Sequence, residues 1–483
     1  MKKNAGILKL IVLLLYITGY GIPGFGQQYN ITDFGAIADG TTDNTIAIQK
    51  AIDSCAITGG KVIVPSGIFI TATLYLKSNV TLRVSGGAVL KAHTDLAKYP
   101  YLNSGIPFYG DQWAKQSLLF CKNAENVSIE GTGTIDGQGA SFPVRTDKKP
   151  DRYKNRPYLL WFAGSKNITI KDVHLQNSAF WMQHYLGCEY LNIDGVKIWN
   201  HSNKNNDMMD IDGCSFVTIS NIIGDSDDDG ITIKSTSPKP SQYITINNCV
   251  LSSHCNALKL GTESTGGFRN IAISNCVIKP SRQLTTIYGK PAGNSGVSLE
   301  LVDGGTMENI TINNLVIDGP QVPLFVRLGN RARKYTDAAA VPPVGKVNNI
   351  RIAHIIARGA DQTGCSFTGL ANAPIENIFL SDISIETTGG GIQKMPVEKV
   401  AEMETAYPEA TMFGELPSYG MFFRHAKGVF LSDIRLSYKE KETRPGIAVV
   451  DTQDFVSSGL AIQTEAKTVP VVYDTVTIKQ KGK

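Results

Sequence analysis

A short alternating phrase of β-branched and polar residues, which recurs along most of the chain, constrains the fold most strongly. Ile193, Ile219, Ile246 and Ile273 occupy the same slot of this phrase, at spacings of 26, 27 and 27 positions. Strands repeated at a fixed period, without helices between them, indicate a solenoid of stacked coils. A β-sandwich also has many short strands, but it gives no reason for one residue type to recur at one slot. We therefore expect a parallel β-helix. Copies of the phrase begin at Asn167, Leu191, Val217, Ile244, Ile271, Ile310, Ile350, Ile378, Val429 and Val476.

One short helix is expected, near the start of the mature chain. It would run from Asn44 to Cys55, with Thr42 or Asp43 as its cap. This helix would cover the open end of the solenoid core, as a terminal cap must. Its apolar residues lie near helical spacing and are Ile46, Ala47, Ala51 and Ile52.

Two long stretches, residues 140–156 and 389–420, interrupt the repeats. Long loops on a rigid scaffold are often functional. The second stretch contains Tyr407, Phe413 and Tyr419, which could wall off one end of a cleft or simply pack against the last coils. Neither stretch has the composition of a linker, so we expect a single domain over residues 27–483.

The first 26 residues have the pattern of an export signal. Lys2 and Lys3 precede an apolar run from Ile7 to Ile22, and a Gly-rich stretch follows it. Lys9 interrupts the run, which makes a membrane anchor the less favoured alternative. We expect a cleaved signal, a periplasmic or extracellular location, and no membrane attachment after cleavage.

The composition limits the possible partners and cofactors. The net charge of +4 over 483 residues is nearly balanced, so nothing favours nucleic acid or an anionic membrane as a partner. No Cys/His spacing resembles a zinc site. Eight cysteines in an exported protein would allow disulfides. Four of them fall at equivalent slots of successive repeats, however, so we expect a buried ladder of free thiols and leave a bridge elsewhere open. These four are Cys188, Cys214, Cys249 and Cys276.

The densest acidic patch falls on two neighbouring coils, at Asp207 and at Asp228 and Asp229. Aligning the inward residues of the two coils places Asp207 beside Asp229. Because stacked coils lie about 4.8 Å apart, three carboxyl groups would converge. Crowded carboxylates raise the pKa of at least one member, which creates an acid beside a base, as hydrolysis of a glycosidic bond requires. Asp228 and Asp229 can share a cleft only at a bend, since neighbouring strand residues point to opposite faces. The aligned inward residues are Met209, Ile211, Ile231 and Ile233.

A calcium loop is an alternative interpretation of the same acidic run. Asp225, Asp227 and Asp229 fit its first half, but its twelfth position is Thr236, which cannot supply the bidentate carboxylate. We therefore expect neither a metal nor another cofactor.

These motifs resemble glycoside hydrolase family 28, the polygalacturonase family, whose hallmark is Asn-x-Asp followed about one coil later by Asp-Asp. Here the hallmark matches Asn205-Asn206-Asp207 and Asp228-Asp229, and 21 positions separate Asp207 from Asp228. The resemblance covers nearly all of the mature chain. It implies a right-handed parallel β-helix of the pectin-lyase type and hydrolysis with inversion. Asp228 would be the general acid, while Asp207 and Asp229 would activate water. Further matching segments are Asp33-Phe34-Gly35, Arg156-Pro157 and Trp181 to His184.

Two other motifs of the family do not match. Asn256 takes the position of the family's histidine in Gly-His-Gly, and His254 lies two residues earlier. Ser298 and Glu300 replace the arginine and lysine of an Arg-Ile-Lys motif that binds a substrate carboxylate in the family.

A cation for the substrate would then have to come from elsewhere. Lys259 or Lys234 could supply it, although Lys259 could instead pair with Asp210 or Glu263. The residues expected to contact substrate are Asn205, Asp210, His254, Asn256 and Lys259.

We expect a monomeric enzyme that hydrolyses a galacturonate-containing pectic polysaccharide or oligosaccharide. Since the cations of Arg-Ile-Lys are missing, a rhamnogalacturonan-type substrate is favoured over plain homogalacturonan, and a wall at one end of the cleft would favour cleavage from chain ends. Two alternatives stay open: a polysaccharide lyase on the same scaffold, which would need a Lys or Arg base and commonly calcium, and a non-catalytic carbohydrate-binding β-helix.

Overall fold

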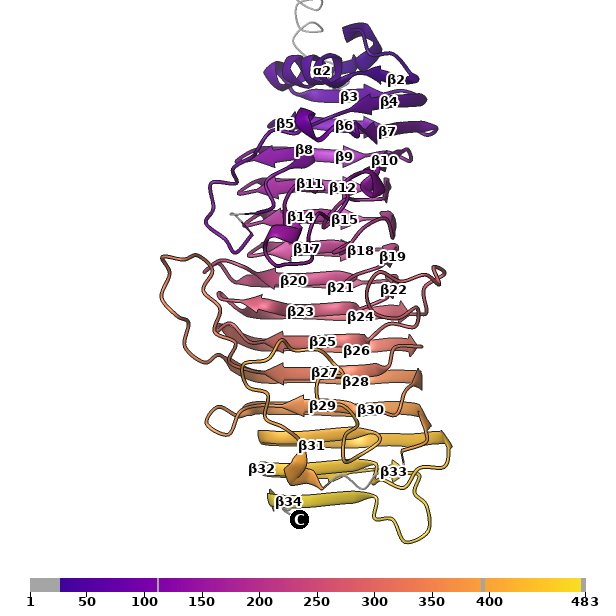
Figure 1. Ribbon diagram of the computed structural model, residues 1–483, viewed down its shortest axis with the longest axis vertical. Helices are drawn as coiled ribbons and strands as arrows, with labels where there is room; N and C mark the ends of the chain where they lie inside the picture. The colour runs from indigo at the N-terminus through magenta and orange to yellow at the C-terminus, as the bar shows by residue number, and fades with distance from the viewer. Residues whose placement is uncertain (1–26, 111–112, 392–395, 479–483) are drawn as a thin grey trace, which may run out of the picture.

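The computed structural model describes residues 27–110, 113–391 and 396–478, and the expected export signal in residues 1–26 lies outside this range. The strands wind along one long axis, from the N-terminal end to the C-terminal end (Figure 1). Each strand pairs in parallel with its equivalent on the next coil, and 34 strands join in this way. The expected parallel β-helix is therefore confirmed.

The strands form three stacks along the axis, here called A, B and C. Stack A, which carries the acidic cluster, contains β5 (Leu74–Leu76), β8 (Ser117–Lys122), β11 (Tyr158–Ala163), β14 (Gln183–Leu186), β17 (Met209–Asp212), β20 (Ile231–Ser235), β23 (Asn256–Ser264), β25 (Ser295–Leu301), β27 (Val322–Leu328), β29 (Cys365–Thr368) and parts of β31 (Met421–Glu440), β32 (Ile447–Ser458) and β34 (Val471–Ile478).

Stack B contains β1 (Gln28–Asn30), β3 (Gly60–Val64), β6 (Val80–Val84), β9 (Glu125–Glu130), β12 (Lys166–Lys171), β15 (Glu189–Asp194), β18 (Ser215–Ser220), β21 (Ser241–Asn247), β24 (Phe268–Ile278), β26 (Thr306–Asp318), β28 (Lys346–Ala360) and β30 (Ile375–Gly389), which pairs with β31. Stack C contains β2 (Asp39–Asp43), β4 (Gly67–Thr71), β7 (Ala88–Ala92), β10 (Thr134–Asp136), β13 (His174–Gln176), β16 (Lys197–Asn200), β19 (Ile223–Ser226) and β22 (Val250–Ser253), then parts of β24 and later strands, with β33 (Ala461–Ile462) on β31.

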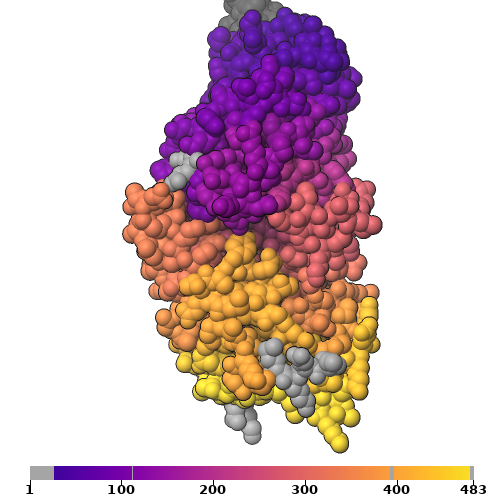
Figure 2. Space-filling view, viewed as in Figure 1, coloured from indigo at the N-terminus to yellow at the C-terminus, as the bar shows by residue number. Residues whose placement is uncertain are grey.

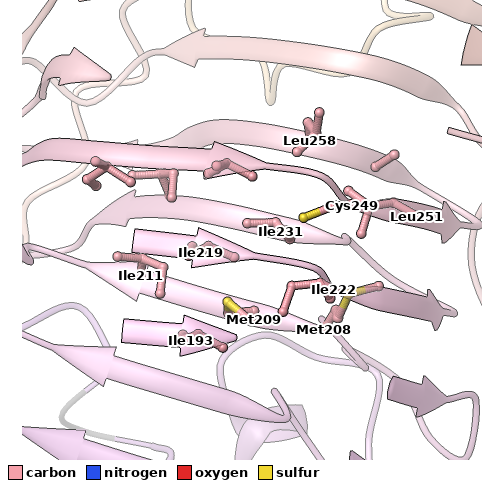
Figure 3. Close-up of a cluster of buried hydrophobic side chains, with 14 of the residues drawn as sticks. Ile193, Met208, Met209, Ile211, Ile219, Ile222, Ile231, Cys249, Leu251 and Leu258 are labelled. Carbon is pink, nitrogen blue, oxygen red and sulfur yellow. The ribbon is translucent and has the colours of Figure 1, made fainter. Parts of the chain in front are cut away.

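The repeated isoleucines build the core. Ile193 lies opposite Ile219, Ile219 opposite Ile246, and Ile246 opposite Ile273, so the spacing in the sequence is the register of the coils. All four are buried, and Figure 3 shows part of this inner column, including Ile193 and Ile219. The described cysteines are all buried and free, which confirms the expected thiol arrangement.

The helix α2 (Thr45–Thr58) covers the N-terminal end of the column (Figure 1). Its N-cap position is Asn44, not Thr42 or Asp43 as expected. Because the helix starts there, Ile48 turns into the core with Ala51 and Ile52, whereas Ile46 is 73% exposed. The helix that covers the end of the core is therefore confirmed, whereas its predicted N-cap residue and the core position given to Ile46 were wrong.

Loops at the corners of the coils add only short helical turns. Five 3-10 turns occur in the described residues: η1 (Ile31–Phe34), η2 (Leu96–Lys98), η3 (Gly139–Ser141), η4 (Asp151–Tyr153) and η5 (Val397–Lys399). Among the described helices, none has the length and apolarity to cross a membrane.

Candidate active site

Asp207 lies at the end of a tightly held turn before β17. The side-chain oxygen of Asn206 accepts hydrogen bonds from the backbone N–H groups of Ser202 and Asn203 at 2.8 and 2.6 Å. The buried Arg156 donates to the side-chain oxygen of Asn205 at 3.1 Å. Arg156-Pro157, noted in the sequence as a matching segment, thus fixes the Asn205–Asp207 turn.

Asp228 and Asp229 lie between the end of β19 and the start of β20, so they occupy a bend, as the sharing of one cleft requires. The hydroxyl of Ser226 donates to the carbonyl oxygens of both residues at 3.0 and 3.1 Å. Gly230 is needed next, because a Cβ there would come within 2.3 Å of the carbonyl oxygen of Ala257 on the following coil.

The register between the two acidic coils is the predicted one. Met209 pairs with Ile231, and Ile211 pairs with Ile233. The backbone N–H of Met208 donates to the carbonyl oxygen of Asp229 at 2.8 Å, so the turn with Asp207 stacks on the bend with Asp229.

These three aspartates line one pocket on the outer side of stack A, together with Asn205. The space between its walls, counted out to open solvent, is about 730 Å³. Loops far apart in the sequence enclose it. Figure 2 shows the purple segment that contains residue 150 and the orange segment that contains residue 400 meeting on one face. The other lining residues include Tyr109, Trp113, Lys149, Tyr153, Tyr158, Phe180, Trp181, Lys234, Glu263, Arg331, Arg333 and Tyr407.

Two of the carboxyl groups are held toward their protonated forms. Burial, and then the charge of Asp229, raise the pKa of Asp228 to about 6. Burial, and then the charges of Asp210 and Asp228, raise the pKa of Asp207 well above its ordinary value.

Asp229 has a different environment, because both of its carboxylate oxygens meet donors. Asn256 donates to Oδ1 at 2.7 Å, and the ammonium of Lys259 lies 2.9 Å from Oδ2. The same ammonium lies 3.5 Å from Oε2 of Glu300, and all of these groups are buried. Asn256 and Lys259, expected to contact substrate, therefore contact Asp229 instead, and neither lines the pocket.

Lys234 has the partners that were considered for Lys259. Its ammonium lies 3.4 Å from Asp210 and from Glu263, and 3.7 Å from Asp207. The pairing of Lys259 with Asp210 or Glu263 was therefore wrong. Asp210 is fully buried behind the pocket wall, so its expected contact with substrate is also corrected to a contact with Lys234.

His254 is neither at the surface nor in the pocket. Its buried ring meets Oδ1 of Asp227 through Nδ1 at 2.8 Å and the carbonyl oxygen of Gln283 through Nε2 at 2.8 Å. Despite burial, the hydrogen bond to Asp227 raises the pKa of His254, in keeping with an imidazolium that donates from both nitrogens. His254 is thus corrected from a substrate contact to a support for the bend that carries Asp228.

The carboxylates of the proposed calcium loop have separate partners. Asp225 meets His201 at 2.9 Å, Asp227 meets His254, and Asp229 meets Lys259. Each of the three carboxylates is thus already paired with a histidine or a lysine of the protein.

Several pocket residues were missed from the sequence. Arg331 and Arg333 lie in the loop between β27 and β28, and Lys149 and Tyr153 lie in the loop between β10 and β11. The cluster Arg331, Arg333 and Lys334, in another break of the repeat, was a usable signal. Of the three aromatic residues singled out in the second long loop, only Tyr407 lines the pocket. Phe413 packs near Arg327, and Tyr419 is buried in the core, so a wall made by all three was wrong.

The model of glycosyl hydrolases family 28 matches residues 55–406. The chain belongs to this family. Among curated relatives, a probable polygalacturonase of Vitis vinifera is 33% identical over 217 residues, which cover 43% of this chain and 44% of the relative. An exo-poly-alpha-D-galacturonosidase of Dickeya chrysanthemi is 30% identical over 259 residues, which cover 44% of this chain and 43% of the relative. Each match thus spans less than half of the relative's length.

Among solved structures, the family 28 fold is matched by a hyperthermoactive exopolygalacturonase of Thermotoga maritima. The two share 24% sequence identity and superpose with a TM-score of 0.63, over 75% of this chain and 87% of the other. At this identity the likeness concerns the fold.

Proposed function

We propose that this family 28 chain is an inverting glycoside hydrolase that removes galacturonate from the ends of pectic chains. The observation that carries the proposal is the unequal environment of three carboxyl groups in one pocket. Asp228 has a raised pKa, as a general acid needs, whereas Asp229 is paired with an ammonium, as an ionised base needs. Hydrolysis with inversion requires this pair.

The different environments of the three aspartates suggest a separate catalytic role for each. Asp228 would protonate the leaving oxygen, and Asp229 would take a proton from the attacking water. Asp207, whose pKa is raised well above the ordinary value, would orient that water rather than act as a second base in the empty site. This differs from the equal roles that the family resemblance implies for Asp207 and Asp229.

Cleavage from chain ends is supported by the position of Tyr407. Its ring lies beside three cations from separate segments, with centroid distances of 5.5 Å to Lys149, 5.7 Å to Lys259 and 5.7 Å to Arg331. The ring is 49% exposed and lines the pocket, and we infer that it closes one end of it. A polymer that must end at this wall would lose one unit at a time.

A neutral sugar next to the cleaved galacturonate is supported by the Lys259 cluster. Ser298 and Glu300 replace two cations of the family motif, and Lys259 is flanked by two carboxylates. Within the described residues, the ammonium of Lys259 is thus already paired and is not free to bind a second uronate. A rhamnogalacturonan-type chain end would suit this part of the site better than plain homogalacturonan.

The test is a parallel digestion of polygalacturonate, rhamnogalacturonan and defined oligosaccharides, scored for reducing ends, ultraviolet absorbance and viscosity. We expect reducing ends from rhamnogalacturonan-type chain ends, released as single sugars, with little change in viscosity. Absorbance from an unsaturated uronide would identify a lyase, and the absence of any product would favour a binding protein. A rapid fall in the viscosity of polygalacturonate would contradict both the chain-end action and the preferred substrate.

A further inference from the structure

The cationic side chains that line the pocket differ in how many carboxylates of the protein they pair with. Lys234 is buried among Asp207, Asp210 and Glu263. Despite burial, these surroundings raise the pKa of Lys234 well above its ordinary value, with Glu263 as the largest contributor. An ammonium so completely paired has little left to offer a ligand.

Arg331 and Arg333 line the pocket, and each is held by a carboxylate that binds only part of its guanidinium. Arg331 binds the buried Asp303 through Nε at 2.9 Å and through Nη2. Arg333 binds Glu263 through Nη2 at 2.5 Å, and its guanidinium lies 3.4 Å from the ring centroid of Tyr109. Each arginine has a second terminal nitrogen, Nη1, that makes no hydrogen bond to a protein group within the described residues. Anchors of this kind hold a planar donor ready for a carboxylate.

Lys149 has no ion pair with any carboxylate in the part of the chain that the structure describes. Its ammonium lies at the mouth of the pocket, 5.5 Å from the ring centroid of Tyr407. Loss of hydration around the amine, and then the charge of Arg152, lower the pKa of Lys149, with Arg333 adding to the effect. A bound anion would relieve both the repulsion and the missing pairing.

We propose that Lys149, Arg331 and Arg333 form a clamp for the ionised carboxyl group of the sugar unit that enters the pocket. Lys149 and Arg331 both lie within 5.7 Å of the Tyr407 ring centroid, so groups from two separate loops converge there. Charge-assisted hydrogen bonds to these three groups would select a free uronate over a neutral hexose or a uronate methyl ester.

This inference rests on the proposed hydrolysis only for its kinetic readout, because binding can be measured separately. The probes are D-galacturonate and D-galactose, which differ by a carboxylate, with the fluorescence of the pocket tryptophans Trp113 and Trp181 as the signal. We expect galacturonate to bind, galactose to bind at least tenfold more weakly, and added salt to weaken only galacturonate.

The decisive variant is Lys149→Met, with Lys148→Met as its control. Both side chains are exposed on one loop, but Lys148 does not line the pocket. We expect Lys149→Met to weaken galacturonate binding by about 10- to 100-fold, the usual range for losing a hydrogen bond to a charged group, and to raise KM rather than lower kcat. Lys149→Arg should keep most of the binding, and Lys148→Met should match the wild type.

The outcomes separate the clamp from the reaction. Suppose that the wild type hydrolyses pectic oligosaccharides and that Lys149→Met has the same ratio of KM values as the wild type for free and methyl-esterified uronates. The clamp is then wrong, and the proposed hydrolysis stands. If galacturonate binds through Lys149 while no substrate is hydrolysed, the clamp stands and the proposed reaction fails. Equal binding of galacturonate and galactose by the wild type would overturn the clamp.

Discussion

The ammonium of Lys259 lies 2.9 Å from Oδ2 of Asp229, and both groups are buried. The same ammonium faces Glu300 at 3.5 Å, where burial, opposed by the charge of Lys259, raises the pKa of the carboxyl to about 7. One cation thus lies between two acids, and one of these, Glu300, occupies a position where the family motif noted in the sequence has a cation. Under the proposed mechanism, this arrangement would place a positive charge beside the proposed base Asp229 and would leave Lys259 no charge for a second substrate carboxylate.

Replacing Lys259 with an uncharged residue should lower the stability of the fold. Breaking a buried ion pair commonly costs about 3–5 kcal/mol, so Lys259→Met should lower the free energy of unfolding by an amount of that order, as measured in urea. Adding Glu300→Gln to Lys259→Met should recover part of the loss, because one of the two uncompensated carboxylates is then gone. An unchanged unfolding curve for Lys259→Met would contradict the role given to this pair.

Asp228→Asn should abolish turnover without harming the fold. A carboxamide cannot protonate the leaving oxygen, and loss of a general acid usually costs about 10²–10⁴-fold or more. Because Asp228 is buried beside other carboxyl groups, the thermal midpoint should stay equal or rise slightly at neutral pH. Wild-type activity in this variant, on a substrate that the wild type cleaves, would show that another group is the acid.

The titration of Asp228 should affect both the activity and the stability of the protein as the pH changes. The pKa of Asp228 is raised to about 6, so kcat/KM should fall as the pH rises through about 6 and the acid loses its proton. The ordinary pKa of an aspartate is about 3.9, so between pH 4 and 6 the folded state holds a proton that the unfolded state has released. The free energy of unfolding should therefore decrease as the pH rises across this window. Asp228→Asn should flatten the decrease, which urea unfolding at several pH values can measure.

The product of the first turnover should have the opposite anomeric configuration to the bond cleaved. In the proposed mechanism, water activated by Asp229 would attack from the side opposite the leaving group, which Asp228 would protonate. Proton NMR recorded within the first minutes, before mutarotation, distinguishes the anomers. Retention would require a covalent intermediate and a nucleophile, and would rule out the base proposed here.

Opening the wall at Tyr407 should change where chains are cut. Tyr407→Ala removes the ring that lines the pocket, and we expect longer products and a faster fall in viscosity for each bond cleaved. Tyr407→Phe keeps the ring and should release single sugars as the wild type does. If Tyr407→Ala still releases only single sugars, the wall lies elsewhere.

The fold was predictable because its determinants are local and repeated. A β-helix core needs an apolar residue at the same position of every coil. The spacing of Ile193, Ile219 and Ile246 therefore predicts both the strands and their register. The approach of Asp207 to Asp229 followed from that register alone. The start of the helix was harder to predict, because it depended on which of Thr42, Asp43 and Asn44 formed the N-cap.

The rest of the pocket is built by loops, and the conformation of a loop cannot be predicted from the sequence repeat. Lys149, Arg331 and Tyr407 come from three separate loops of the solenoid, and only their packing shows that they meet. Burial also reassigned side chains that the sequence could place only on the outer face. Asp210 and His254 lie on coils of the site, yet they face Lys234 and Asp227 rather than solvent.

The position of α2 has a consequence for the solution behaviour of the protein. Every described coil presents its backbone groups along the axis to the next one, so an uncovered end would offer a ready template for a strand of another molecule. The helix covers one such end with Ile48, Ala51 and Ile52. Shortening α2 should therefore lead to end-to-end fibrils, with chains adding along the axis while the pocket on the flank of each molecule stays intact.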